Sequence, residues 1–507
     1  MTTTNLPPAW RRYALCLLFA ILMSLSFPPL QLGFLAYWGL LPLFYLLEGL
    51  SYKQALKWAY LAGVLWNLGT LYWIGWVTLP GLVGVILVLP LYLLIYVWAH
   101  LFLRQRLGAK YIFLTPFVWT AVEYLKSLGS LGFPWTSLAY TQTYYTDLIQ
   151  YASLTGAYGV SFWIVWINVI LFVIIKQRPI GKRLFSYLIA LVLLFLLPLI
   201  YAKLVVPRPS EFKEGIRVAL VQGNIDPYLK WDDSFVTRNM VIYDSLTLAC
   251  QNQKPELVIW PETATACFLR AKLDYQAPVL KLVDQLNAPI LTGSPDYRFL
   301  ENGKYETYNG LLLLQPDFSP MQSYWKMHLV PFGERVPFED SIPYLHNFFE
   351  NLNMGTGDFA PGHEYKIFTM NWHNQNLPFA GVICYESVFP DQVRRFIKMG
   401  GKLLVIVTND AWFGNTSGPY QHNQIAIFRA IENRVSIARC ANTGISCLVD
   451  PFGKILARTK LNEQTTLTGN VPLYASTTFY TQHGDLFAIV LTGLSGMALV
   501  LATLRRS

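Results

Sequence analysis

Long apolar stretches separated by short polar connections dominate the chain before residue 206. Most of them approach the roughly 20 residues that an α-helix needs to cross a bilayer. Seven lie before residue 206 and an eighth lies near the C-terminus, at 12–30, 34–49, 55–78, 80–103, 111–127, 157–176, 183–205 and 485–504. The second and fifth are short. The pattern predicts an α-helical membrane bundle of about eight transmembrane helices.

From about residue 216 the pattern changes to short apolar runs that alternate with longer amphipathic segments. Runs of strand length lie at 218–221, 257–260, 290–292, 311–314, 381–384, 403–408 and 446–449. Helical periodicity appears at 231–251, 277–286 and 421–435, and Pro278 then falls in a first turn, where proline is tolerated. Alternating strands and helices predict a layered α/β domain. The expected domains are therefore a transmembrane bundle (1–205), an α/β domain (206–483) and a C-terminal transmembrane helix (484–507).

Composition and charge place the chain in a membrane. Its residues are 53% hydrophobic and 14% charged, too apolar for an ordinary soluble protein. Residues 207–483 carry 24 basic and 26 acidic residues, a net charge of −2, and the remainder carries 15 and 4, a net charge of +11. The basic excess thus belongs to the membrane segments, and a nucleic-acid partner is not indicated.

The positions of the basic residues predict the orientation. Each basic group is separated from the next by two spans, so all of them fall on one face. They are Arg11/Arg12, Lys53/Lys57, Arg104/Arg106/Lys110, Lys176/Arg178/Lys182/Arg183 and Arg505/Arg506. Because basic loops stay in the cytoplasm, both termini are expected there and the α/β domain on the opposite face.

Three residues that follow apolar segments suggest a nucleophilic site. Cys384 follows the apolar run 379–383 within the sequence GVICYE at 381–386, and Glu262 ends LVIWPE at 257–262. Lys326 lies between aromatic residues and a Pro-Phe-Gly turn. Alone, Cys384 reads as a buried structural cysteine. Together, the glutamate is a general base, the thiol attacks a carbonyl and the lysine stabilises thiolate and oxyanion, lowering the thiol pKa below its free value of about 8.5.

The motifs WPE, K…PFGE and CYE, in that order between about residues 216 and 471, resemble the carbon–nitrogen hydrolase (nitrilase) superfamily. With membrane segments on both sides, the chain as a whole is similar to the apolipoprotein N-acyltransferases. The sequences TNDAWFG at 408–414, QH at 421–422 and RAIEN at 429–433 also resemble that family. The resemblance implies a four-layer αββα sandwich with a Glu262–Lys326–Cys384 triad.

The resemblance also implies a reaction and a location. An acyl chain would pass from a membrane phospholipid, through a Cys384 thioester, to the α-amino group of the N-terminal diacylglyceryl-cysteine of an apolipoprotein. This is the final step of bacterial lipoprotein maturation. The expected enzyme is a monomer of the bacterial inner membrane with a periplasmic catalytic domain, and it needs no cofactor or metal.

Further residues are candidates for supporting roles. Glu334 corresponds to a residue that assists the triad, or it is a turn carboxylate that caps a helix. Tyr385 and Glu386 shape the pocket, unless Glu386 belongs to a buried ion pair. Trp231 corresponds to an aromatic residue near the family's site, although tryptophan is more often part of a core. Asn409 and Asp410 are expected to order the site through hydrogen bonds, whereas His328 and His422 are expected to be structural rather than catalytic.

The α/β domain holds five of the six cysteines, so at least one thiol there is unpaired. Cys384 is the expected one, and a disulfide between Cys440 and Cys447 remains open. The insertion at 337–365 carries apolar residues and is expected to be a mobile lid that touches the membrane, or an ordinary packed loop.

Two other functions fit parts of the pattern. One is a membrane-tethered, nitrilase-like amidase that acts on a small C–N substrate. The other is a non-enzymatic transport or assembly protein whose outer domain binds a ligand.

Overall fold

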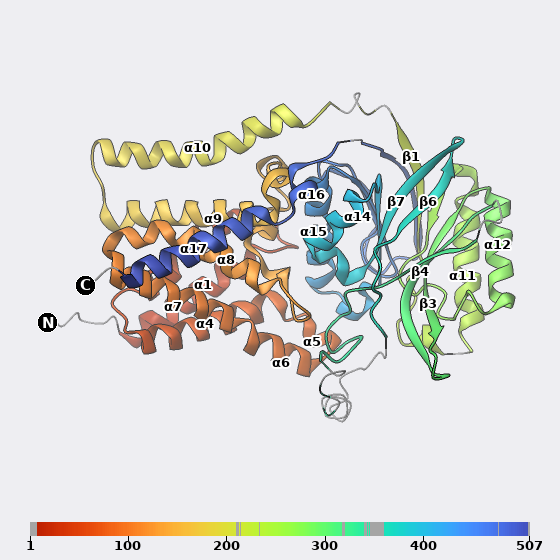
Figure 1. The fold of residues 1–507 in the computed structure, drawn as a ribbon, viewed down its shortest axis with the longest axis horizontal. Helices are drawn as coiled ribbons and strands as arrows, with labels where there is room; N and C mark the ends of the chain where they lie inside the picture. Colours follow the sequence, from red (N-terminus) through yellow and green to blue (C-terminus); the bar gives the residue numbers. More distant parts are fainter. Residues whose placement is uncertain are drawn as a thin grey trace. The chain divides into compact units, whose positions relative to one another are not determined.

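The computed structural model describes residues 8–208, 212, 214–232, 234–316, 320–338, 342, 344, 359–474 and 476–504. The chain divides into two compact units, a helical unit (Met1–Val206 and His483–Ser507) and an α/β unit (Pro207–Gln482) (Figure 1). Most of the insertion at 337–365, and with it the predicted lid, lies outside the described residues, as do Arg505 and Arg506.

Helices of the helical unit coincide with the apolar stretches of the sequence. They are α1 (Ala9–Leu25), α2 (Ala36–Gly39), α3 (Leu41–Leu46), α4 (Tyr52–Leu71), α5 (Ile74–Val77), α6 (Leu79–Val88), α7 (Pro90–Leu107), α8 (Thr115–Lys126), α9 (Ala152–Gln177), α10 (Lys182–Val205) and α17 (Leu486–Leu504). Gly156 adopts φ +65° inside α9, so the regular helix begins after it, where the apolar stretch begins.

In the part of the chain that the structure describes, fewer helical stretches than expected are both long and apolar enough to cross a bilayer. Among the described residues, four helical stretches are both long and apolar enough: Leu79–Lys126, Ala152–Gln177, Lys182–Val205 and Leu486–Leu504. Helix α1 has 17 residues, and the predicted second span is broken into α2 and α3, where a new helix starts with Pro42 in its first turn. The chain is a membrane protein with several apolar helices, and the prediction of eight spans is supported only to that extent.

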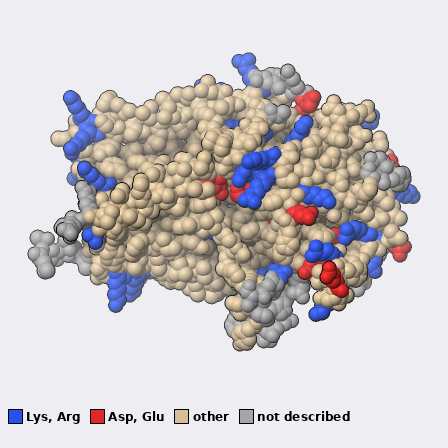
Figure 2. All heavy atoms as spheres, in the orientation of Figure 1, with Lys and Arg blue, Asp and Glu red and all other residues tan. Residues whose placement is uncertain are grey.

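Basic residues from different helices meet at one end of the helical unit. Arg104 in the last turn of α7 donates to the carbonyl oxygen of Leu47 at 2.8 Å. Lys176 in the last turn of α9 lies 2.5 Å from the carboxylate of Glu48. In Figure 2 the flank of this unit shows few charged side chains, and its visible basic side chains gather at one end.

The described part of the α/β unit contains two six-stranded sheets. Their strand orders are β12-β1-β2-β3-β4-β5 and β11-β10-β9-β8-β7-β6. The strands of the first sheet are β1 (Gly215–Gln222), β2 (Leu257–Ile259), β3 (Ile290–Phe299), β4 (Tyr305–Leu314), β5 (Gln322–Trp325) and β12 (Thr465–Pro472). Those of the second are β6 (Ile367–Trp372), β7 (Gln375–Ile383), β8 (Leu403–Thr408), β9 (Ser436–Ala441), β10 (Cys447–Val449) and β11 (Ile455–Arg458). Strands β1, β2 and β3 run parallel, and so do β7, β8 and β9.

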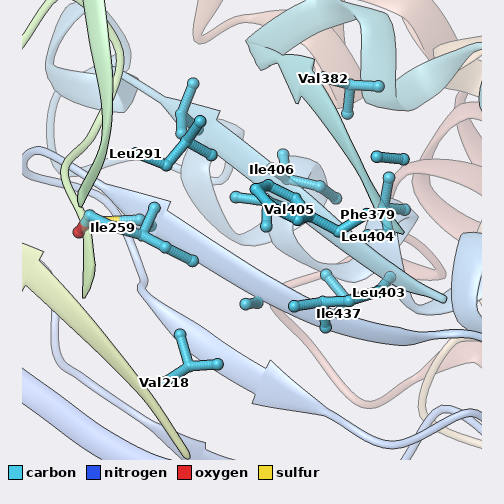
Figure 3. Close-up of a cluster of buried hydrophobic side chains, with 14 of the residues drawn as sticks. Val218, Ile259, Leu291, Phe379, Val382, Leu403, Leu404, Val405, Ile406 and Ile437 are labelled. Carbon is cyan, nitrogen blue, oxygen red and sulfur yellow. Dashed lines mark hydrogen bonds between the residues drawn. The ribbon is translucent and has the colours of Figure 1, made fainter. Parts of the chain in front are cut away.

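Side-chain alternation along the strands builds two cores. Ile216, Val218 and Leu220 of β1 join the cluster that contains both sheets, whereas Ala219 and Val221 join the cluster beneath α11 (Val236–Ala249) and α12 (Leu273–Leu286). Figure 3 shows the first cluster, where side chains of β1, β2 and β3 meet those of β7, β8 and β9.

Helices α14 (Pro390–Lys398) and α15 (Gly418–Asn433) contribute side chains to this first cluster, where they pack against the second sheet. Helices α11 and α12 therefore lie outside the first sheet, and helices α14 and α15 lie outside the second (Figure 1). The predicted αββα sandwich is present in the structure.

One local prediction is wrong. Helix α12 begins at Leu273, four residues before the expected start, so Pro278 lies inside the helix instead of in its first turn. Asp274 near its N-terminus favours the earlier start because it complements the helix dipole.

Candidate active site

Cys384 lies where β7 ends and the chain turns into a 3-10 helix, Cys384–Val388. The residue is 9% exposed and has φ +51°, a left-handed conformation that is uncommon for a residue other than glycine. The apolar run of β7 therefore delivers the thiol to the carboxyl end of a parallel strand, where α/β proteins commonly place their sites.

Glu262 lies just after β2, in a turn that is tightly fitted. Thr263 has φ +47°, and a Cβ atom at Gly293 would lie 2.5 Å from the Pro261 oxygen and from the Thr263 nitrogen. Only glycine on β3 lets this turn approach so closely. The Glu262 carboxylate accepts a hydrogen bond from the backbone N–H of Asn409 at 2.9 Å.

Lys326 follows β5 and is 1% exposed. Its Nζ atom lies 3.4 Å from Glu262 Oε1 and 2.8 Å from Glu334 Oε2. Burial disfavours the charge, but the carboxylates of Glu334 and Glu262 outweigh it, so the pKa of Lys326 is raised above its ordinary value. Lys326 is a cation shared by two carboxylates.

Asn309 on β4 completes this group, and the sequence analysis missed it. Its Nδ2 atom donates to Glu262 Oε1 at 2.8 Å and to Glu334 Oε1 at 2.9 Å. The available signal was an amide two residues before the apolar run 311–314. Glu334 also accepts from the backbone N–H of Val330 at 2.8 Å, so it closes its own turn as well as binding Lys326.

The environment of the Cys384 thiol differs from the expected one. Burial raises the pKa of Cys384 above its usual range, the Glu262 carboxylate raises it further, and Lys326 lowers it only in part. The expectation that Lys326 brings the thiol pKa below its free value is therefore wrong for the resting site. At neutral pH the nucleophile is a thiol, and a base must take its proton as it attacks.

Glu386 anchors the loops around the site. Its carboxylate accepts hydrogen bonds from Ile383 N at 2.9 Å and Met327 N at 2.8 Å. The Tyr324 hydroxyl at 2.6 Å and Gln392 Nε2 at 2.7 Å also donate to it. These donors are neutral, so the contacts of Glu386 with the described residues are hydrogen bonds and not the alternative ion pair. It joins the turn that carries Cys384 to the segment that carries Lys326.

Two aromatic candidates lie at different depths. Tyr385 is buried, with its ring edge-to-face with Phe389 at 5.1 Å and near His328 at 5.8 Å between centroids. Trp231 is 45% exposed, and its ring contacts Lys230 Nζ at 5.6 Å. Trp231 is therefore not part of a core.

Lys230 is a buried lysine beside the site that sequence reasoning missed. Its Nζ atom donates to the Glu262 carbonyl oxygen at 3.4 Å and to the Thr263 hydroxyl, so it braces the Glu262 turn. Burial lowers the pKa of Lys230 to about 8, with the Glu262 charge opposing this. Nothing in the sequence distinguished it from a solvated lysine.

All six cysteines are described, and all are free thiols. Cys440 lies between the sheets, with its sulfur 3.2 Å from the Ile259 carbonyl oxygen, and Cys447 contacts Asn423 Oδ1 at 3.1 Å. These two cysteines do not pair. Within the described residues, no cluster of His, Cys, Asp and Glu side chains is arranged to hold a metal ion.

A buried thiol beside a carboxylate–lysine pair, at the strand ends of an αββα sandwich, places the α/β unit in the carbon–nitrogen hydrolase class. Residues 217–479 match the carbon–nitrogen hydrolase family, and residues 19–170 match the apolipoprotein N-acyltransferase N-terminal domain. The chain belongs to the apolipoprotein N-acyltransferase family, and it is an acyltransferase of the nitrilase superfamily.

Two relatives of similar length, both apolipoprotein N-acyltransferases, support this membership. The apolipoprotein N-acyltransferase of Geobacter metallireducens is 36% identical, over 98% of this chain and 96% of the relative. That of Chlorobaculum tepidum is 33% identical, over 97% of both chains. Among solved structures, an amidase from Nesterenkonia sp. is 19% identical, covers 53% of this chain and 92% of its own, and has a TM-score of 0.39.

Proposed function

We propose that the protein transfers an acyl chain from a membrane phospholipid, through a thioester on Cys384, to the α-amino group of the N-terminal diacylglyceryl-cysteine of an apolipoprotein. The observation that carries the proposal is a buried thiol that interacts electrostatically with the charges of Glu262 and Lys326. The same chain also has apolar helices of membrane length. The catalytic residues are Glu262, Lys326 and Cys384, with Glu334, Tyr385, Glu386 and Trp231 in support.

The first half-reaction forms the acyl-enzyme. The sulfur of Cys384 attacks the ester carbonyl of the phospholipid while Glu262 takes the thiol proton. The Lys326 ammonium stabilises the oxyanion of the tetrahedral intermediate. The intermediate collapses with loss of the glycerol oxygen, which receives the proton from Glu262 and leaves as a lysophospholipid alcohol.

The second half-reaction uses the same groups in reverse. The neutral α-amino group of the apolipoprotein attacks the thioester carbonyl, and Glu262 takes a proton from the attacking nitrogen. The C–S bond breaks, the sulfur of Cys384 regains a proton, and an amide remains on the acceptor. The acyl chain therefore passes through one site in a ping-pong sequence.

Lys326 acts as a charge and not as a base. Its pKa is raised by the two carboxylates, so it keeps its proton throughout the neutral range. Glu334 balances this cation when Glu262 becomes protonated, because its Oε2 atom stays 2.8 Å from Nζ. The site thus keeps a cation beside the reacting carbonyl during both proton transfers.

An acyl-transfer assay tests the proposal against the amidase alternative. Purified protein in phospholipid vesicles should add one acyl mass to a diacylated lipopeptide and release an equal amount of lysophospholipid. An N-acetylated lipopeptide, which lacks the attacking amine, is the matched control and should gain no acyl chain. Release of ammonia from small amides without any acyl transfer would favour the amidase. Membership of an enzyme family already argues against a purely transporting role.

We infer that all eight apolar stretches cross the inner membrane, with both termini cytoplasmic and residues 206–483 in the periplasm as one domain. The orientation is supported by the basic residues at one end of the helical unit, where Arg104 and Lys176 both contact the connection between α3 and α4. Basic groups gather on the cytoplasmic face of a membrane protein.

Protease sites inserted into two connections test the orientation. A site at 460–462, in the α/β unit, should be cut by protease added outside spheroplasts, and a site at 178–181, between α9 and α10, should be cut only after lysis. The opposite pattern of cleavage would refute the orientation.

A further inference from the structure

A buried charged cluster lies behind the nucleophile, and the acyl-transfer steps do not use it. Asp410, His422 and Arg439 are at most 1% exposed. Asp410 Oδ1 lies 2.8 Å from His422 Nδ1, and Asp410 Oδ2 accepts from Arg439 Nη2 at 2.8 Å. Burying charges is costly even when they are paired, because each one loses its hydration. A cluster of this kind therefore needs a role that offsets the cost.

The cluster contacts Cys384 at two points. His422 Nε2 lies 3.2 Å from the carbonyl oxygen of Cys384, which also accepts from the Ser387 hydroxyl at 2.7 Å. On the other side, the Thr408 hydroxyl donates to Asp410 Oδ1 at 2.9 Å and its side chain is hydrogen-bonded to the Cys384 thiol. Both the carbonyl and the sulfur of the nucleophile are thus linked to Asp410.

These contacts hold a strained residue. The left-handed conformation of Cys384 is unfavourable for a residue other than glycine, and it persists only where the surroundings impose it. The peptide that follows Cys384 is planar, so fixing its carbonyl oxygen on His422 fixes the whole plane and directs the next N–H away from His422. The orientation of the Cys384 backbone, and with it of the thiol, is set by this bond.

The hydrogen-bond partners of His422 show how its ring is held. Although burial opposes it, the charges of Arg439 and His422 keep the pKa of Asp410 below its ordinary range, so Asp410 only accepts. The carbonyl oxygen of Cys384 also only accepts. Nε2 therefore donates to this oxygen, and the ring of His422 links Asp410 to the nucleophile.

Gly444 provides the space for this arrangement. A Cβ atom at Gly444 would lie 2.3 Å from Asp410 Oδ2 and 2.9 Å from Asp410 Cγ. A larger residue would push the carboxylate away from Arg439 and His422 without touching Cys384. A substitution at position 444 should therefore disturb the cluster directly and leave the catalytic side chains in place.

We propose that His422, braced by Asp410 and Arg439, is a positioning residue that sets the orientation of the Cys384 peptide and thiol for acyl transfer. This proposal rests on the proposed function only because acyl transfer from phospholipid is one of the reactions that measure it. The histidine, which the sequence analysis took as structural, acts on the rate of the chemical step through the geometry of the nucleophile.

His422→Gln is the main test, and Gly444→Ala is the second variant. Acylation of the protein by phospholipid in a single turnover should slow by about 10²-fold, as expected for a misplaced reacting group, with the lipid concentration at half-maximal rate unchanged within twofold. The matched control is Asp450→Asn, another buried carboxylate of the same unit, which closes its own turn at Phe452 N and Lys454 N. It should leave the acylation rate unchanged.

A second measurement separates failure of this proposal from failure of the proposed function. Alkylation of Cys384 by iodoacetamide needs no lipid and should slow in both variants compared with Asp450→Asn. If the parent protein takes no acyl chain from phospholipid, the proposed function fails and alkylation alone decides the role of His422. Unchanged alkylation, or a loss confined to lipid affinity, overturns the proposal. If His422→Gln does not fold, Gly444→Ala carries both measurements.

Discussion

Cys384→Ala should abolish acylation of the protein by phospholipid. The wild-type protein, incubated with phospholipid and no acceptor, should gain one fatty acyl mass that neutral hydroxylamine removes, because a thioester is far more labile than an amide. Without the sulfur, the site lacks the thiol on which the proposed thioester forms. Intact-protein mass spectrometry measures the adduct directly.

Two further variants make this result specific. Cys384→Ser keeps an attacking oxygen, but the much higher pKa of a hydroxyl should leave it nearly inert beside a glutamate base. Cys267→Ala, at the partly exposed thiol of the same unit, should acylate like the wild type. An adduct mapped to Cys267, or acyl transfer by Cys384→Ala, would contradict the mechanism.

Lys326→Ala should slow acylation by about 10²–10³-fold, the usual cost of one oxyanion donor. The physical reason is the position of Nζ between the carboxylates of Glu262 and Glu334. Removing the cation leaves two like charges that share only the amide of Asn309, which disturbs the base as well as the oxyanion. Single-turnover acylation, followed by mass, measures the loss.

Glu262→Gln should block the same step for a different reason. Because burial holds the thiol in its protonated form, attack requires a base, and general-base catalysis contributes about 10²–10⁴-fold. For Lys326→Ala, the control for loss of a positive charge is Lys272→Ala, at an exposed lysine of the same unit, which should acylate normally. Acylation of Glu262→Gln within threefold of the wild-type rate would rule out Glu262 as the base.

The strands that carry the site were predictable because their burial follows a simple pattern. Strand β8 is buried throughout and apolar up to Thr408, and β7 ends in an apolar run that leads directly to Cys384. Edge strands such as β11 and β12 were not predicted, since their side chains are half-exposed and polar residues interrupt the pattern. Strand β9 was missed for the opposite reason, because Arg439 lies fully buried within it and reads as a surface residue.

The candidate site shows the same division. Glu262, Lys326 and Cys384 each stand at the end of an apolar segment and within a motif, so sequence alone selected them. Asn309 and Lys230 carry no motif, and their contacts with the Glu262 turn come from strands and turns that only folding brings together. The resting pKa of Cys384 also needed the structure, because burial and two opposite charges compete there.

The protonated, buried state of Cys384 has a consequence for the chemical durability of the enzyme. Peroxides and disulfides react with thiolates far faster than with thiols, and they need access to the sulfur. Cys384 is 9% exposed and keeps its proton until a carbonyl is in place. Peroxides and disulfides should therefore oxidise Cys384 only slowly between turnovers. The nucleophile then does not depend on a second cysteine to reduce it again.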